Sequence, residues 1–362
     1  MENLYQLSTS NFYEPDLDKV LGKVDRFLGD EGLIVGSAVE EMEKEFAKYH
    51  EARFCVAYST GFWALVSAIA NRALQNRDEV LLPSLTYRRL ADAVYWTGKT
   101  PVFVDIDLNL ALSPGSVEEN ISDKTALILA VHPIVNCCDV EALLDISKRS
   151  GVPVIFDAVE SVHETVVGKR VGSFGVGEVF SLHASKLLNG LEGGYICTDD
   201  EAYASRLREW RMGGGTGLNA VMNDIHAIFA LASLEEVESN VKHNKDIYRH
   251  YQETLSKISH VRLLEFDERE QTSYKHIVVE VLDGFPVSRD ELVELFNQQG
   301  ILARAHYWPP LHEKQYRYPV RTTSMEVTDW ASGRFLNLPC GYRVTVRDVD
   351  YVCDVLSRPG RG

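Results

Sequence analysis

Lys186 lies in a sequence context that suits a reactive lysine. It follows an apolar run at residues 179–182 that is typical of a buried strand, and small or hydroxyl-bearing residues surround it, from Ser181 to the pair Gly193-Gly194. An amine at the end of a strand can act as a nucleophile toward a carbonyl group. A lysine that is merely solvated at the surface is the alternative, so the interpretation depends on other residues.

Asp157 is a second candidate because it ends another apolar run, residues 152–157. A buried carboxylate carries a large free-energy cost unless a cation neutralises it. The protonated pyridine nitrogen of pyridoxal 5′-phosphate (PLP) is such a cation, and a carboxylate that keeps it protonated strengthens the ring as an electron sink. A helix cap after the strand is the alternative role for Asp157.

Residues 58–63 have the composition of a phosphate-binding turn. Thr60 and Gly61 lie between a predicted strand and a predicted helix, where free backbone N–H groups and the helix dipole favour an anion. Turns of this kind also occur in proteins that bind no phosphate. Tyr87, after the next predicted strand, could lay its ring against a cofactor, with core packing as the alternative.

The elements that position these residues alternate between short apolar runs and amphipathic segments. This alternation is typical of βα units and a largely parallel sheet, and it predicts an α/β fold. Seven strands are predicted, at residues 54–57, 79–82, 101–105, 126–131, 154–157, 179–182 and 194–198. Helices are predicted at residues 38–49, 63–74, 88–97, 140–150 and 201–211. Each candidate residue thus falls at or just after the end of a strand.

The pattern changes after the glycine-rich residues 213–217. Residues 222–258 form one long predicted helical stretch that could connect two domains. An alternating run at residues 276–281 and helices at residues 289–299 and 346–356 follow. These elements suit a small α+β domain.

Three parts are therefore predicted. They are a large PLP-binding α/β domain at residues 1–215, a helical interdomain segment at residues 216–258 and a small α+β domain at residues 259–362. The Pro309-Pro310 loop and residues 321–324 are expected to be surface connections of the last part.

The bulk composition argues against several classes of function. The net charge of −16 argues against nucleic-acid binding, which needs clustered Lys and Arg, but it leaves room for a nucleotide-linked small molecule. No stretch approaches the roughly 18 apolar residues of a membrane span, and the amino terminus lacks a secretory signal, so a cytoplasmic protein is expected. The six cysteines lack metal-ligand spacing; reduced, mostly buried thiols and no metal site are predicted, with redox chemistry of Cys137 and Cys138 as the alternative.

Taken together and in this order, the motifs resemble the DegT/DnrJ/EryC1/StrS family of sugar aminotransferases, which are PLP enzymes of the aspartate aminotransferase fold type (fold type I). The similarity covers almost the whole chain. Its motifs lie at residues 32–36, 58–62, 83–87, 101–107, 157–161, 168–175, 180–186, 192–194, 306–312 and 336–339. The resemblance implies a large domain built on the mainly parallel seven-stranded sheet and a small C-terminal α+β domain.

The resemblance also implies roles for individual residues. Lys186 corresponds to the lysine that forms a Schiff base with PLP, and Asp157 to the partner of the pyridinium nitrogen. Thr60, Gly61 and Ser181 correspond to residues that bind the cofactor phosphate.

Four further positions concern the cofactor. Tyr87 corresponds to an aromatic residue against the cofactor face, and Phe62 replaces a frequent threonine of the phosphate turn. Asn219 corresponds to a residue that reaches the cofactor phosphate of the neighbouring subunit, which implies a homodimer with shared active sites. Glu160 departs from the Gln or His common near the phenolic oxygen; an ionised Glu160 would repel the phenolate, a protonated one could donate a hydrogen bond, and both alternatives stay open.

The activity implied by the resemblance is transfer of an amino group from L-glutamate, through PLP, to a keto group of a nucleotide-linked (dTDP, UDP or GDP) deoxysugar. Lys186 would hold the cofactor and then, as a free amine, move a proton between Cα and C4′. A free cyclic ketone, such as an aminocyclitol precursor, is the alternative acceptor, and a non-catalytic sensor or scaffold is the alternative from another class. Lys186 argues against the dehydration that some relatives perform with histidine at this position.

Overall fold

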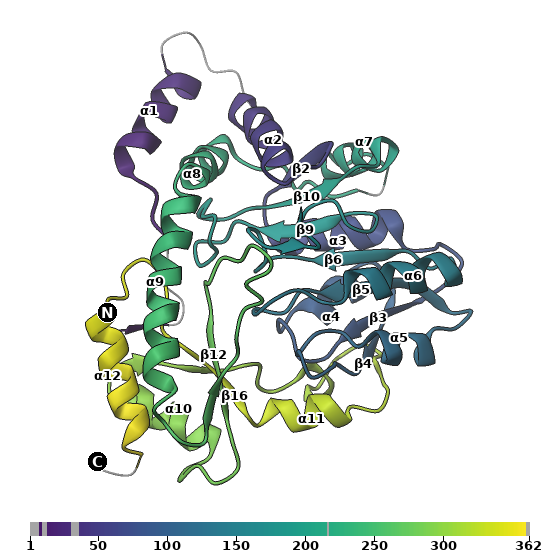
Figure 1. The fold of residues 1–362 in the computed structure, drawn as a ribbon. Helices are drawn as coiled ribbons and strands as arrows, with labels where there is room; N and C mark the ends of the chain where they lie inside the picture. The colour runs from purple at the N-terminus through teal and green to yellow at the C-terminus, as the bar shows by residue number, and fades with distance from the viewer. Residues whose placement is uncertain (1–6, 9–12, 30–35, 216, 360–362) are drawn as a thin grey trace.

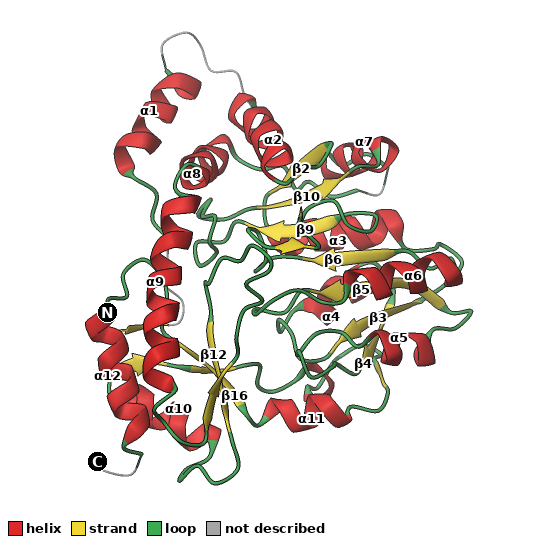
Figure 2. Cartoon of the chain, viewed as in Figure 1, coloured by secondary structure: helices red, strands yellow, loops and turns green. Residues whose placement is uncertain are grey.

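The computed structural model describes residues 7–8, 13–29, 36–215 and 217–359 (Figure 1). The architecture is mixed α/β, with helices on both faces of a large central sheet. A smaller sheet with helices of its own lies beside it (Figure 2). None of the helices in these residues is long and apolar enough to cross a membrane.

The central sheet has eight strands in the order β15-β4-β3-β5-β6-β9-β10-β2. The strands are β2 (Phe54–Tyr58), β3 (Glu79–Pro83), β4 (Thr100–Val104), β5 (Thr125–Val131), β6 (Val154–Asp157), β9 (Glu178–Ser181), β10 (Gly194–Thr198) and β15 (Arg321–Thr322). β10 runs antiparallel to its neighbours β9 and β2, and the other pairings are parallel. The prediction of a mainly parallel sheet is confirmed.

Helices on both faces explain why the strands are apolar along their whole length. Successive side chains of a strand face opposite sides. In β3, Val80 and Leu82 pack in the cluster that holds α3, α4 and α7, whereas Leu81 packs with α5 and α6. Toward β2, the second face is covered by α1, α2 and α8. The helices are α1 (Leu17–Leu28), α2 (Ser37–Tyr49), α3 (Gly61–Arg72), α4 (Leu90–Trp96), α5 (Pro114–Asn120), α6 (Val140–Ser150), α7 (Glu201–Arg211) and α8 (Asp224–Leu234).

The C-terminal part is built on a four-stranded antiparallel sheet in the order β11-β12-β16-β14. In Figure 1, α9 runs from α8 down to this sheet, and it packs against α12. The strands are β11 (Val261–Leu263), β12 (Ile277–Val281), β14 (Arg304–Ala305) and β16 (Phe335–Leu338). The helices are α9 (Val237–Leu255), α10 (Arg289–Gln298), α11 (Glu326–Ser332), α12 (Val346–Ser357) and the 3-10 helix η1 (Leu311–Glu313). Two small sheets complete the fold, β1 (Leu7–Ser8) with β13 (Ile301–Leu302), and β7 (Thr165–Val166) with β8 (Lys169–Arg170).

Two details differ from the sequence-based expectations. All seven predicted strands are present, but β15 is an eighth strand of the central sheet, so part of the expected surface connection at residues 321–324 is instead a short strand, although an exposed one. β15 consists of only two residues, both exposed, which pair with Val102 and Phe103 of β4. Two exposed residues form no pattern of apolar side chains in the sequence from which a strand could be predicted.

The second difference is that residues 222–258 form two helices, α8 and α9, rather than one. α8 packs against α1 and α2, whereas α9 packs against α12 and β11. The two helices bury their apolar sides against different partners, so the chain must turn between them, at Glu235 and Glu236. The domain boundaries at residues 215 and 258 stay predictions.

Candidate active site at the carboxyl edge of the central sheet

The predicted site residues follow strands that end at the same edge of the central sheet. β2 and β9 are both antiparallel to β10, so they point in the same direction, which β6 and β3 share. In α/β sheets, this carboxyl edge is where ligands bind. The residues that follow these strands or end them are Thr60 and Gly61 after β2, Tyr87 after β3, Asp157 in β6, Glu160 after β6, Ser181 in β9 and Lys186 after β9.

The turn after β2 is shaped for a small anion. Thr60 caps α3, and its hydroxyl oxygen accepts the N–H of Trp63 at 3.2 Å. The N–H groups of Gly61 and Phe62, in the first turn, have no earlier carbonyl of the helix to bond. A Cβ on Gly61 would lie 2.9 Å from Cβ and 3.0 Å from Oγ of Ser181, so only glycine lets β9 approach this closely. The arrangement fits a phosphate group held by backbone N–H groups and by the Ser181 hydroxyl.

Phe62 contributes packing to this turn. Its ring lies 4.3 Å from the guanidinium carbon of Arg89 and makes an edge contact with Trp63. An aromatic ring in place of a hydroxyl therefore brings a cationic side chain next to the turn.

Asp157 is almost fully buried, with 1% of its surface exposed. Its Oδ1 accepts the N–H of Val159 at 3.2 Å. Burial raises the pKa of Asp157 to about 6, although that hydrogen bond and the charge of Lys186 act in the opposite direction. A cation such as a pyridinium placed against this carboxyl would stabilise its ionised form, so Asp157 fits the ring nitrogen of PLP.

Tyr87 borders the same space. It is partly exposed and lines a small cavity together with Asp157, Glu160, His306 and Tyr307. An aromatic side chain at the rim of a cavity that contains the ring-nitrogen partner suits a face-to-face contact with a planar ring.

Glu160 lies at the centre of a cluster of basic groups. Its Oε1 bonds Nζ of Lys186, and its Oε2 accepts from Nζ of Lys275 at 2.6 Å and lies 3.1 Å from Nε2 of His276. Burial alone would raise the pKa of Glu160, but the ammonium groups of Lys186 and Lys275 outweigh burial and hold it well below its usual range. Of the two alternatives left by the sequence, the structure therefore favours the ionised carboxylate.

Lys275 and His276 were missed by sequence reasoning. They precede β12 in the C-terminal part, 115 and 116 residues from Glu160. Burial lowers the pKa of both residues. The sequence does show a Lys-His pair directly before an apolar strand. The neighbouring residues, however, do not indicate which carboxylate this pair contacts.

Asn219 stands apart from the other predicted residues. Its side chain is exposed and makes no hydrogen bond within the part of the chain that the structure describes. Its backbone lies opposite Met212, and the carbonyl of the next residue, Ala220, accepts the N–H of Ser59 beside the phosphate turn.

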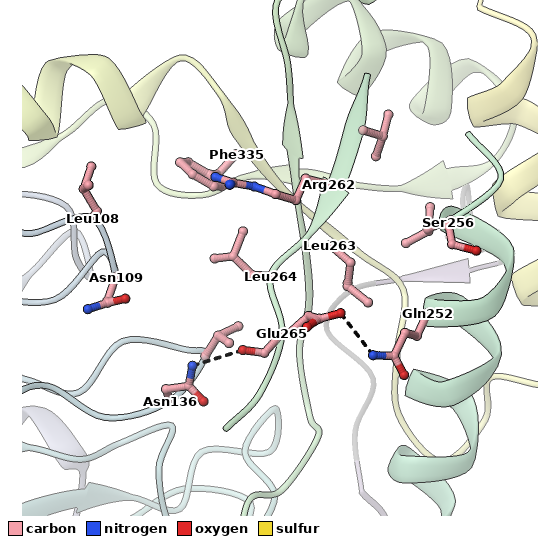
Figure 3. A pocket seen from close by; sticks show the side chains of 13 residues that line it. Leu108, Asn109, Asn136, Gln252, Ser256, Arg262, Leu263, Leu264, Glu265 and Phe335 are labelled. Carbon is pink, nitrogen blue, oxygen red and sulfur yellow. Dashed lines mark hydrogen bonds between the residues drawn. The ribbon is translucent and has the colours of Figure 1, made fainter. Parts of the chain in front are cut away.

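A larger cavity of about 550 Å³ lies outside this site, between the 108–109 and 135–136 loops and β11 (Figure 3). Two of its polar side chains already have partners. Gln252 donates to Oε1 of Glu265, and Asn136 donates to the Glu265 carbonyl, both at 3.1 Å. No predicted site residue lines it.

The six cysteines are free thiols, five of them buried and Cys137 partly so, as predicted.

Comparison with known proteins gives a consistent result. Residues 17–357 match the DegT/DnrJ/EryC1/StrS aminotransferase family. The GDP-perosamine synthase of Caulobacter vibrioides is 29% identical over 345 residues, covering 90% of each chain. That of Vibrio cholerae is 26% identical over 363 residues, covering 95% of this chain and 97% of that protein. The crystal structure of DesI in the presence of its TDP-sugar product superimposes with a TM-score of 0.92 at 27% identity, covering 97% of this chain and 92% of that one. The chain therefore belongs to the DegT/DnrJ/EryC1/StrS family and is a PLP-dependent aminotransferase.

Proposed function

We propose that the protein transfers an amino group from L-glutamate to a keto group of a nucleotide-linked deoxysugar, with Lys186 as the catalytic residue. The observation that carries this proposal is the meeting of a buried carboxyl, Asp157, with a lysine amine, Lys186, and a helix N-terminus at one edge of the sheet. Relatives that are named for GDP-perosamine or were solved with a TDP-sugar product support a nucleotide-linked acceptor.

The residues of this chain would divide the work as follows. Bound PLP supplies an aldehyde for covalent attachment and a ring that accepts electrons. Thr60, Gly61 and Ser181 would hold its phosphate, and Asp157, as a carboxylate, would be the partner of the ring nitrogen. Lys186 would anchor the cofactor and, once free, would move a proton from the Cα of glutamate to C4′ of the cofactor and, in the second half-reaction, from C4′ to the sugar carbon that bears the new amine.

We also propose that the enzyme works as a homodimer in which Asn219 serves the site of the neighbouring subunit. Asn219 is exposed, its backbone lies opposite Met212, and Val221 follows two residues later; Met212 and Val221 are exposed apolar side chains. A surface that combines apolar side chains with one polar group is suited to a subunit interface. A cytoplasmic location stays a prediction from the sequence.

A two-stage assay tests the proposed reaction. The PLP-loaded protein is first incubated with L-glutamate alone, and one equivalent of 2-oxoglutarate per site is expected. GDP-, UDP- and dTDP-linked keto-deoxysugars and a free cyclic keto-polyol are then added separately, and mass spectrometry detects any aminated product.

We expect amination of a nucleotide-linked sugar and none by a Lys186→Ala variant. Amination of only the free ketone would show that the acceptor is wrongly assigned. No 2-oxoglutarate in the first stage would contradict the aminotransferase mechanism itself.

A further inference from the structure

Three basic side chains share a single carboxylate in this site. The side chains of Glu160, Lys186 and Lys275 are 15%, 16% and 8% exposed, so solvent screens their charges poorly. Each oxygen of Glu160 contacts one of the two lysines. Lys275 is buried and Lys186 is largely buried, so one carboxylate faces two poorly solvated ammonium groups, one more than an ion pair requires.

The second lysine matters when Lys186 forms a covalent bond. Lys186 can form a covalent bond only as a neutral amine that has left its ion pair with Glu160. A buried carboxylate that loses its only cation is strongly destabilised. Lys275 belongs to a different part of the chain, so the release of Lys186 does not require Lys275 to leave Glu160.

The segment that carries Lys275 is held independently of the ion pair. The N–H and hydroxyl of Ser273 donate to Oε1 of the buried Glu164, at 3.1 and 2.7 Å. On the other side of Lys275, His276 leads directly into β12. The ammonium group of Lys275 therefore approaches Glu160 from a fixed backbone.

We propose that Lys275 is a positioning residue that keeps Glu160 ionised and in place while Lys186 is released to bond the cofactor. This inference rests on the proposed role of Lys186. Lys275 acts through Glu160. Because Lys275 remains as a counter-ion, the Glu160 carboxylate is still paired with a cation when Lys186 leaves the ion pair.

Other titratable groups also face this cluster. They are Asp157 in β6, Glu164 in the segment after β6, His276 directly before β12, His306 and Tyr307 after β14, Tyr13 before α1, and Cys340 after β16. None of these is a second ammonium group, so Lys275 has no substitute among them.

The test measures how fast Lys186 captures PLP. Cofactor-free protein is mixed with PLP at neutral and at mildly alkaline pH, the covalent bond is trapped with borohydride at timed intervals, and mass spectrometry quantifies labelled Lys186. Lys275→Met should slow capture about tenfold at neutral pH, because Glu160 then holds the Lys186 ammonium as its only lysine partner. The difference should shrink at alkaline pH, because a lower proton concentration disfavours the ammonium form of any amine.

Two further variants separate positioning from a merely structural role. Lys275→Arg keeps the charge and should capture PLP at nearly the rate of the unmodified protein. Glu160→Gln combined with Lys275→Met removes both charges of the pair and should be faster than Lys275→Met alone. Lys99→Met is the matched control, since Lys99 is also partly buried but donates to backbone carbonyls outside the site.

Slowing that is equal at both pH values and worse in the double variant would make Lys275 structural and overturn the inference, as would unchanged capture by Lys275→Met. Failure of the unmodified protein to label Lys186 at all would instead overturn the proposed function, and the inference with it. If circular dichroism shows that Lys275→Met does not fold, Glu160→Gln is compared with the double variant. Equal rates support the inference, and a much slower double variant contradicts it.

Discussion

Asp157 is buried, Glu160 is largely buried and lies three residues later, yet the pKa values of the two carboxyls shift in opposite directions. Burial disfavours the charged form of both carboxyls. Glu160 has two ammonium groups within hydrogen-bonding distance and stays ionised, whereas Asp157 has one backbone N–H and keeps a raised pKa. Asp157 is thus a carboxyl that still lacks its cation, and a pyridinium would supply one.

Asp157→Asn should stabilise the cofactor-free protein at neutral pH. The folded-state pKa of Asp157 is about 6, above the ordinary value of 3.8. The folded protein therefore holds this proton more tightly than the unfolded chain, and the stability it contributes is lost as the pH rises from about 4 to about 6. Asparagine avoids this loss and should raise the free energy of unfolding at neutral pH by up to about 3 kcal/mol, and by almost nothing near pH 4.

Urea unfolding at the two pH values checks this expectation, with Asp246→Asn, an exposed acid, as the control. The same Asp157→Asn variant should transaminate slower by several orders of magnitude, because the ring nitrogen loses its charge partner. A variant that is less stable at neutral pH, or that turns over normally, would argue that Asp157 has only a structural role.

At the scale of elements, the site depends on how closely the start of α3 approaches β9. Gly61 and Ser181 are in contact, and a Cβ on Gly194 of β10 would lie 2.5 Å from Cα of Gly61. Glycines in this position let a helix N-terminus lie against the sheet edge, which brings its free N–H groups next to a serine hydroxyl.

Gly61→Ala should therefore weaken PLP binding and destabilise the protein. The new Cβ would meet Ser181 at 2.9 Å, so α3 or β9 must shift, at a cost of about 1–3 kcal/mol. Gly115→Ala in α5 is the matched control, because its Cβ would meet nothing closer than 3.7 Å. Thermal unfolding and PLP titration of both variants give the comparison; equal PLP affinity for Gly61→Ala and the unmodified protein would refute a phosphate site at this turn.

The C-terminal part of the molecule contributes residues to the site at the edge of the central sheet. Lys275 and His276 contact Glu160 directly, and β15 extends the central sheet at its far edge. Residues far apart in the chain thus meet beside Lys186. The proposed neighbour-subunit role of Asn219 would extend this sharing to a second chain.

A mixing experiment tests the shared site. Asn219→Ala should weaken PLP retention by roughly 1.5–3 kcal/mol, the loss of one charge-assisted hydrogen bond, without unfolding the chain. In a mixed dimer of Asn219→Ala and Lys186→Ala chains, one site carries both substitutions and the other carries neither, so about half of the normal activity should return. If subunits exchange and activity stays absent, both residues act within one chain.

The sequence alone determined the features that depend on neighbours along the chain. The seven apolar strands, the turn at Thr60 and Gly61, and the positions of Asp157 and Lys186 at strand ends are local patterns, and the strands are confirmed. A parallel sheet brings strand ends to one edge, so local patterns were enough to predict where the candidate residues gather.

Features that depend on distant partners are set by the way the chain packs in three dimensions. The charge of Glu160 was open in the sequence because its partner Lys275 lies 115 residues away. β15 escaped prediction because two exposed residues become a strand only when β4 is beside them. The break between α8 and α9 is set by the different surfaces on which the two helices pack. Electrostatic interactions and packing act through space, so a carboxylate takes its charge state, and a short segment its structure, from whatever the fold places next to it.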